Sequence, residues 1–221
     1  MDRDNPIVCQ ETLQYFKAML PSFSHEAKNV LAVINENAGL MADYILMAQK
    51  GKTLDLERLN SLATIIRKQV ARFNTLITDV RQAAHGIDNN TQTLCLVQHA
   101  RQVSELLSTK AATRSIQFHV SAMEEPILIH TRPVLLLHLI WVCLDYAMQA
   151  SEQGRQIELS LEKKGENACV LMSGIDKLGP DSMPAIMPDE HRNTVLSALN
   201  AELAIDEHEK TLLLKIGKHH A

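Results

Sequence analysis

Two long runs of apolar residues, spaced alternately three and four apart, constrain the fold of this chain more than any other feature. This spacing places apolar side chains in one stripe along an α-helix, as wide as a coiled-coil seam. Residues 50–55 separate the runs: Gly51 breaks the pattern, and Thr53 or Asp55 can cap a following helix. The first run is Ala27, Leu31, Ile34, Ala38, Met41, Ile45 and Ala48, and the second is Leu56, Leu59, Ala63, Ile66, Val70, Phe73, Ile77, Val80 and Ala84.

Two helices with a short connection are expected to lie antiparallel, as a hairpin. A lone hairpin buries little surface, so its remaining apolar positions need a further partner. Association of two chains into a four-helix bundle provides one, and we therefore expect a homodimer. The alternative is that the hairpin packs against the rest of its own chain.

From Gln92 the pattern changes to short strands that alternate with helices. The predicted order is β-α-β-β-α-β-β-α-β, which gives a mixed sheet with helices on one face. We therefore expect an α+β protein, with a helical domain at residues 1–88 and a second domain at residues 89–221. The expected strands cover 93–97, 115–120, 126–130, 156–162, 168–174 and 210–217, and the expected helices cover 96–114, 131–151 and 191–202.

The composition argues against several kinds of partner. With a net charge of -4 and no block of Lys or Arg, we expect no nucleic-acid binding. The longest apolar stretch, residues 133–148, contains His138 and Asp145 and is too short to span a bilayer, so we expect no membrane insertion. The amino terminus is polar and acidic, unlike a signal peptide, and the four cysteines form no C-x-x-C pair. These features predict a reduced, cytoplasmic protein.

The first helix carries one candidate reactive group, in the segment "HEAKN". A zinc-protease helix would need a second histidine at position 29, which is Asn29, so we expect no zinc site. Asn29 lies one turn after His25 on a small, polar face that continues to Ala32. An exposed imidazole with the Glu26 carboxylate beside it and an amide one turn below can act as a nucleophile. The alternative is an ordinary surface histidine.

The stretch "FSHEAKNVLAVINENAGLM" resembles the phosphoacceptor helix of bacterial sensor histidine kinases, and "HLIWVCLDYAMQAS" resembles the buried helix of their GHKL-type ATPase domain. The resemblance implies a dimerisation hairpin followed by an α/β-sandwich domain. It also implies that His25 is phosphorylated, that Glu26 assists as a base, and that Asn29 orients water in a phosphatase reaction.

The second domain departs from the family pattern. The family holds magnesium with an asparagine immediately before A-x-x-A, where this chain has Tyr146, and Asp145 is one residue out of register. The family's Asp-x-Gly-x-Gly turn for adenine is reduced to Asp176 and Gly179 at the wrong spacing, and no G-x-G cluster follows. We therefore expect no ATP and no cofactor or metal held by this chain.

A phosphoacceptor hairpin joined to a degenerate ATPase-like domain is similar to dimeric histidine phosphotransferases. That resemblance implies a phosphorelay protein that moves phosphoryl groups between His25 and the aspartates of response regulators. The response regulator would supply the aspartate and the Mg²⁺ and would dock near Lys28, Asn29 and Ala32. The alternatives are an atypical kinase that uses ATP, and a non-catalytic pseudokinase that sequesters a response regulator. A phosphatase role through Glu26 and Asn29 is a variant of the phosphorelay hypothesis.

Overall fold

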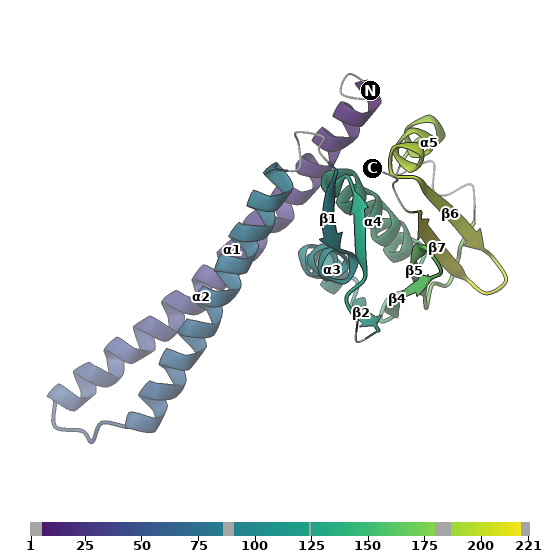
Figure 1. Ribbon diagram of the computed structural model, residues 1–221. Coiled ribbons are helices and arrows are strands. Elements are labelled where there is room, and N and C mark those ends of the chain that lie inside the picture. Colours follow the sequence, from purple (N-terminus) through teal and green to yellow (C-terminus); the bar gives the residue numbers. More distant parts are fainter. Residues whose placement is uncertain (1–5, 86–90, 124, 180–186, 218–221) are drawn as a thin grey trace. The chain divides into compact units, whose positions relative to one another are not determined.

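Two long helices open the chain and form the expected hairpin. The computed structural model describes residues 6–85, 91–123, 125–179 and 187–217. Helix α1 spans Pro6–Gln49 and helix α2 spans Leu56–His85 (Figure 1). Of the two expected caps, Asp55 begins α2, because its carboxylate accepts the backbone N–H of Arg58 at 2.9 Å. Helix α1 begins well before Pro21, which lies inside it.

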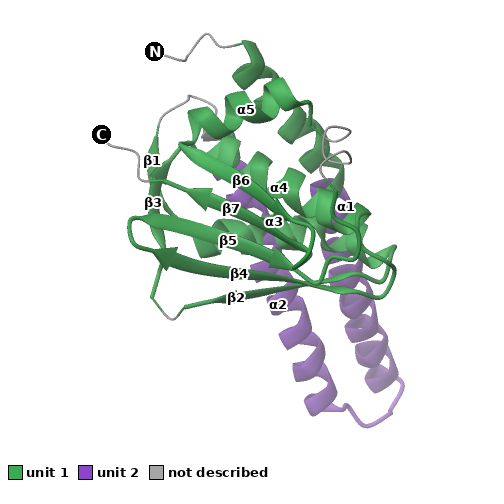
Figure 2. Cartoon of the chain, turned by 90° about the vertical axis from the view of Figure 1, so that its right-hand side faces the viewer, with its two compact units in different colours: residues 1–22, 83–221 green, residues 23–82 purple. Residues whose placement is uncertain are grey.

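The chain divides into two compact units, which Figure 2 distinguishes by colour. One unit, purple in Figure 2, is residues 23–82 of the hairpin. The other unit, green in Figure 2, combines residues 1–22 with residues 83–221. We call this green part the second unit, because most of it follows the hairpin in the sequence. The sequence analysis expected residues 1–88 to form one helical domain. In the structure, residues 1–22 at the start of α1 belong instead with the α/β part of the chain. The difference arises because Tyr15 packs edge-on against Trp141, with ring centroids 6.2 Å apart, and Glu11 is buried beside His138.

The second unit is built on a mixed five-stranded sheet in the order β2-β4-β5-β7-β6. Strands β2 (Gln117–Ala122) and β4 (Gln156–Lys164) are parallel, and the other pairs are antiparallel. Along β4, buried residues alternate with half-buried ones, as expected where one face is covered. The covered face lies against helices α3 (Leu96–Ala112) and α4 (Pro133–Gln149), as Figure 2 shows.

Helix α4 is the centre of this core. Almost every residue of the helix is buried, which agrees with its apolar composition on all sides. A small antiparallel sheet of β1 (Gln92–Cys95) and β3 (Leu128–Thr131) completes this part of the fold. The expected hairpin near residue 165 is confirmed, because β4 pairs in register with β5 (Asn167–Ser173) across a turn that contains Gly165.

The structure contains a strand that the sequence analysis missed. The expected helix over 191–202 ends early, as α5 (Asp189–Ala198), and Asn200 follows with a φ of 48°. Strand β6 (Ala201–Asp206) then pairs with β7 (Thr211–Ile216). Gly217 follows β7 and packs closely against Asn200: a Cβ atom at position 217 would lie 3.0 Å from the backbone oxygen of Asn200. The loop expected between β5 and α5 lies partly outside the described residues, at 180–186.

Among the described residues, α1 is the one helix that is long and apolar enough to cross a membrane by length and composition. This is weak evidence for a membrane span, because long helices that pack in protein interiors or bundles meet the same criterion.

Candidate functional site

The hairpin brings a different stripe of α1 against α2 from the one expected. The buried residues of α1 in this unit are Glu26, Val30 and Asn37, and those of α2 are Leu62 and Leu76. We call these positions the inner stripe. The expected stripe lies one residue further along the helix, and much of it is exposed, including Leu31 at 52% and Ile45 at 47%. Other residues of the expected stripe are half-buried, among them Ile34, Ile66 and Phe73, so the expected stripe coincides only in part with the seam between the two helices of one chain.

The inner stripe contains a buried charge. Glu26 is 6% exposed, and its carboxylate forms a salt bridge with the guanidinium of Arg72 on α2. A carboxylate at this depth needs such a partner, since an unpaired buried charge is strongly destabilising. The sequence analysis named Glu26 but missed Arg72. A basic residue 46 positions away, on a helix whose register was unknown, gave no local signal.

His25 precedes Glu26 and lies about 100° around the helix from it, on the exposed surface. Its Nδ1 atom is 3.2 Å from the side-chain nitrogen of Asn29. The structure therefore brings together two of the three predicted site residues, His25 and Asn29, on one face. Because Nδ1 is engaged by its own helix, Nε2 is the ring nitrogen left for an external group. Lys28 and Ala32 are also exposed.

The inner stripe separates two flanks of different character. Half-buried residues of the two helices, such as Tyr44, Gln69 and Phe73, extend the inner stripe. We call the residues that directly follow an inner-stripe or half-buried residue in the sequence the apolar flank. The residues that directly precede one are the polar flank. Each flank of α1 faces the same side as the corresponding flank of α2, because antiparallel helices meet with equivalent positions on the same side. The apolar residues of the apolar flank are Ala27, Leu31, Ala38, Ile45, Ala63, Val70 and Ile77, and Arg67 and Asn74 lie among them. The polar residues of the polar flank include His25, Asn29, Glu36, Lys68, Arg72 and Thr75, and Leu40 and Ile65 lie among them.

In the second unit, Tyr146 occupies the position where the resemblance implies a magnesium ligand. Its side chain is 1% exposed. The phenol oxygen donates to the carbonyl of Gly179 at 2.7 Å and accepts the backbone N–H of the same residue at 3.1 Å. This phenol ties the end of α4 to the chain after β5 and offers no carboxylate or amide oxygen to a hard cation.

The two nearby carboxylates are also engaged by the protein. Asp145 accepts a hydrogen bond from Lys110 of α3. Asp176 accepts the backbone N–H of Glu152 at 2.9 Å and forms a salt bridge with Arg155. The Glu152 N–H and the Arg155 guanidinium hold the pKa of Asp176 below its usual value. Both the carboxylate next to the expected magnesium position, Asp145, and the one retained from the adenine-binding turn, Asp176, are therefore paired within the protein.

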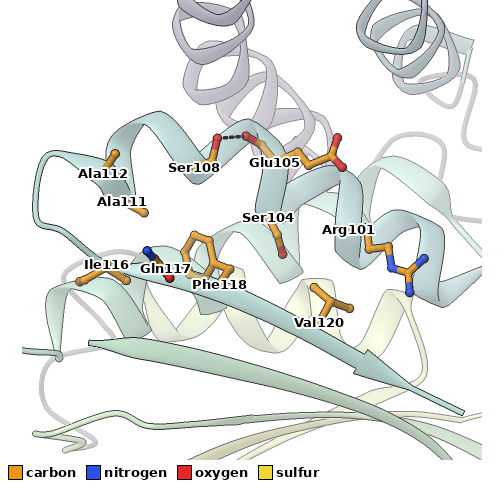
Figure 3. A pocket seen from close by; sticks show the side chains of 10 residues that line it. All are labelled: Arg101, Ser104, Glu105, Ser108, Ala111, Ala112, Ile116, Gln117, Phe118 and Val120. Atoms are coloured by element: carbon orange, nitrogen blue, oxygen red, sulfur yellow. Dashed lines mark hydrogen bonds between the residues drawn. The ribbon is translucent and has the colours of Figure 1, made fainter. Parts of the chain in front are cut away.

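The described residues of this unit line several cavities, of which two are large. One of about 450 Å³ lies at the end of α4 and is lined by Tyr146, Gln149, Glu152 and Lys177 among others. Another of about 470 Å³ lies between α3 and the edge strand β2, with Phe118 and Val120 at its base and Arg101 and Glu105 on the helix side (Figure 3). Within the described ranges, no three His, Cys, Asp or Glu side chains are grouped so that they could hold a metal ion.

Comparison with solved structures identifies the fold of the second unit. The catalytic domain of the histidine kinase ThkA aligns with 58% of this chain and 97% of its own, at 13% identity and a TM-score of 0.51. The carboxyl-terminal part of this chain has the fold of a histidine kinase catalytic domain. The predicted fold class and the resemblance to sensor histidine kinases are confirmed at the level of the fold.

Longer alignments give lower scores. The Acinetobacter baumannii histidine kinase AdeS aligns with 83% of this chain and 96% of its own, at 11% identity and a TM-score of 0.48. ThkA in complex with the response regulator TrrA aligns with 99% of this chain and 65% of its own, at 15% identity and a TM-score of 0.48. No protein-family model matches the chain, and no curated protein sequence matches it.

Proposed function

We propose that this protein is a histidine phosphotransfer protein in a two-component phosphorelay. It accepts a phosphoryl group on His25 from the aspartate of one response-regulator receiver domain and donates it to the aspartate of another. The observation that carries the proposal is the exposed imidazole of His25, held by Asn29 on the polar flank of the hairpin. The fold of the second unit supports it, because this fold occurs in histidine kinases.

The transfer step needs little beyond this imidazole. The lone pair of Nε2 attacks the phosphorus of the aspartyl phosphate, the N–P bond forms, the O–P bond breaks, and the carboxylate oxygen leaves with the electron pair. Nε2 must then be unprotonated, so the ring proton resides on Nδ1. In the structure the side-chain nitrogen of Asn29 faces Nδ1 at 3.2 Å. The reactive tautomer needs this amide turned over, so that its oxygen accepts the Nδ1 proton. The receiver supplies the Mg²⁺.

Glu26 takes a different role from the one that the resemblance implies. Its carboxylate is paired with Arg72 inside the hairpin, so it holds the turn that carries His25. Asn29, and not Glu26, is the residue that contacts the imidazole nitrogen in this state.

The proposal also holds that the second unit does not use ATP. The supporting contacts are those of Tyr146, Asp145 and Asp176, whose polar atoms are engaged by Gly179, Lys110 and Arg155. The described residues at the end of α4 and after β5 therefore do not fit Mg²⁺-ATP, and in this proposal the phosphoryl group comes from a partner. The atypical-kinase reading predicts instead that ATP alone labels His25.

Two parallel incubations test the function. The purified chain is mixed either with a panel of ³²P-phosphorylated receiver domains or with labelled ATP and Mg²⁺. We expect acid-labile, base-stable label on the chain with at least one receiver and none with ATP. Label from ATP alone would establish the kinase reading, and binding of a receiver without any transfer would establish the pseudokinase reading.

Asn29 is expected to set the tautomer of His25. Replacing Asn29 by Ala removes the contact with Nδ1 and should slow transfer to His25 by about 10-fold, within the range of general acid–base and orienting effects. Asn29→Asp supplies a fixed acceptor for the Nδ1 proton and should retain the rate. The measurement is a single-turnover transfer rate from one receiver. Equal rates for the Ala variant and the wild type would contradict this role.

We further propose that two chains associate through the apolar flank to form a four-helix bundle. The supporting observation is that its large side chains are exposed in the single chain: Leu31, Ile45, Val70 and Ile77 are each 44–52% exposed. The same spacing continues toward the start of α1 with Leu13 and Leu20, which are 70% and 46% exposed. Large exposed patches of apolar side chains are typical of protein interaction surfaces.

A charge within the apolar flank should dissociate the dimer. For Leu31→Glu we expect the mass of one chain by light scattering at micromolar concentration, whereas the wild type has the mass of two. Ala32→Glu is the matched control, because it adds the same charge one residue later on an exposed position outside the apolar flank, and it should remain dimeric. A monomeric wild type would refute the bundle.

A further inference from the structure

Arg72 has a second feature besides its salt bridge with Glu26. Its side chain is 53% exposed, whereas that of Glu26 is 8% exposed. A guanidinium carries five N–H donors in a planar fork, and a single carboxylate engages at most two of them well. The Arg72 side chain therefore reaches from the buried carboxylate to the surface of the hairpin, with donors to spare on the outer side.

The exposed part of Arg72 lies on the same side of the hairpin as His25. His25 directly precedes Glu26 of the inner stripe, and Arg72 directly precedes the half-buried Phe73, so both belong to the polar flank. The salt bridge fixes the register, because it places Arg72 beside the residue that follows His25. Lys68 is exposed on the same flank, one turn before Arg72.

We propose that Arg72, assisted by Lys68, is the phosphoryl-binding side of the His25 site. The inference rests on the proposed phosphoacceptor role of His25 and adds the group that recognises the charge being transferred. A phosphoryl group carries close to two negative charges and presents oxygens that match the guanidinium fork. Arg72 binds these oxygens through its free N–H groups while Glu26 holds the other side of the fork.

This arrangement explains why a charged pair occupies the inner stripe, where an apolar pair would pack equally well. Glu26 restrains a long, flexible arginine so that less side-chain entropy is lost when the phosphoryl group binds. Two roles can therefore be separated. The pair as a whole stabilises the hairpin, and Arg72 alone contacts the phosphoryl group.

The test uses phosphoramidate, a small donor that needs no receiver. Nε2 of His25 attacks its phosphorus, the P–N bond breaks, and ammonia leaves. The full chain is incubated with phosphoramidate, and the rate of phosphohistidine formation is followed by ³¹P NMR. The variant Glu26→Gln/Arg72→Met removes both charges together, so that no unpaired charge remains in the hairpin. Its fold is checked by circular dichroism and by chain mass.

We expect the double variant to be phosphorylated at least about 10-fold more slowly than the wild type, as for loss of one charge-stabilising donor. Arg72→Lys should recover part of the rate, and Glu26→Gln alone should react at a rate between those of the double variant and the wild type, because Arg72 remains but loses its restraint. Arg67→Met is the matched control: it removes one positive charge from the same helix about 140° away, and should change the rate less than twofold.

A double variant that folds and reacts at the wild-type rate would overturn the proposal, since Arg72 would then be only a counter-ion for Glu26. If the double variant fails to fold, Arg72→Lys and Lys68→Met decide by titration of the His25 ring signals with inorganic phosphate. If Arg72→Lys and Lys68→Met both bind inorganic phosphate with the wild-type affinity, the proposal is likewise overturned. Phosphoramidate reactivity that depends on Arg72, with no transfer from any receiver, would refute the phosphorelay and leave the anion site standing.

Discussion

A His25→Gln variant is expected to carry no acid-labile phosphate after incubation with a phosphorylated receiver that labels the wild type. The amide of Gln has no nucleophilic nitrogen lone pair, so the N–P bond cannot form. His25 is exposed on the polar flank, and a side chain of similar size can replace it without disturbing the inner stripe. The loss should therefore be complete at full stability, as measured by thermal unfolding.

His119→Gln serves as the control for this experiment. His119 is an exposed histidine on strand β2, in the other unit of the chain, and its loss should leave labelling unchanged. Label that survives in His25→Gln and disappears in another histidine variant would move the phosphoacceptor elsewhere. The assignment of Glu26, Asn29 and Arg72 to the site would then fail with it.

Acid is expected to destabilise the second unit through His138. Burial lowers the pKa of His138 from 6.5 to about 4. Between these values the unfolded chain binds a proton that the folded chain does not, so the free energy of unfolding falls as the pH falls. At about 1.4 kcal/mol per pKa unit, the loss between pH 6.5 and pH 4 is about 3 kcal/mol. Above pH 6.5 this residue contributes no pH dependence.

The surroundings of His138 explain why it stays neutral. Its Nδ1 atom lies 3.4 Å from one carboxylate oxygen of Glu11. The centroids of the His138 and Tyr15 rings are 6.1 Å apart. The other oxygen of Glu11 is only 2.6 Å from Nδ1 of His191 on α5. Glu11 is thus committed to the less buried histidine, and the desolvation of His138 outweighs its longer contact with the same carboxylate.

Urea unfolding of the wild type and of His138→Leu, monitored through Trp141 fluorescence at pH 7, 5.5 and 4.5, measures this contribution. The wild type should lose stability across the series more steeply than the variant, because Leu cannot be protonated. His119→Gln is again the control and should follow the wild type, since the side chain it replaces is exposed. Parallel pH dependences for the wild type and His138→Leu would show that His138 does not carry the effect.

The heptad spacing predicted the two hairpin helices correctly, but it did not identify which face lies between them. The inner stripe contains Glu26 and Asn37, polar residues that a reading of apolar spacing assigns to the surface. Only the contact with Arg72 across the hairpin makes Glu26 a core residue. The stripe through Leu31 and Ile45 is more regular, yet both residues are exposed in the single chain. Sequence periodicity alone reports that a face is apolar and does not say what covers it.

In the second unit, the sequence analysis predicted every described helix and every described strand except β6. Helix α4 follows from its uninterrupted apolar composition. Strand β6 was missed because its exposed edge residues alternate weakly and β7 provides its hydrogen bonds. The loss of the asparagine at Tyr146 was visible in the sequence. The double hydrogen bond of its phenol with Gly179 was not, because the two residues are 33 positions apart.

The proposed roles of the two flanks imply a stoichiometry for the complex between this protein and a receiver domain. If two chains join through the apolar flank, the polar flanks point away from the dimer axis on opposite sides. Each His25 then lies on its own side of the bundle, and one dimer offers two separate sites to receivers. Saturation at two receivers per two chains, with independent affinities, is the binding curve that this geometry requires.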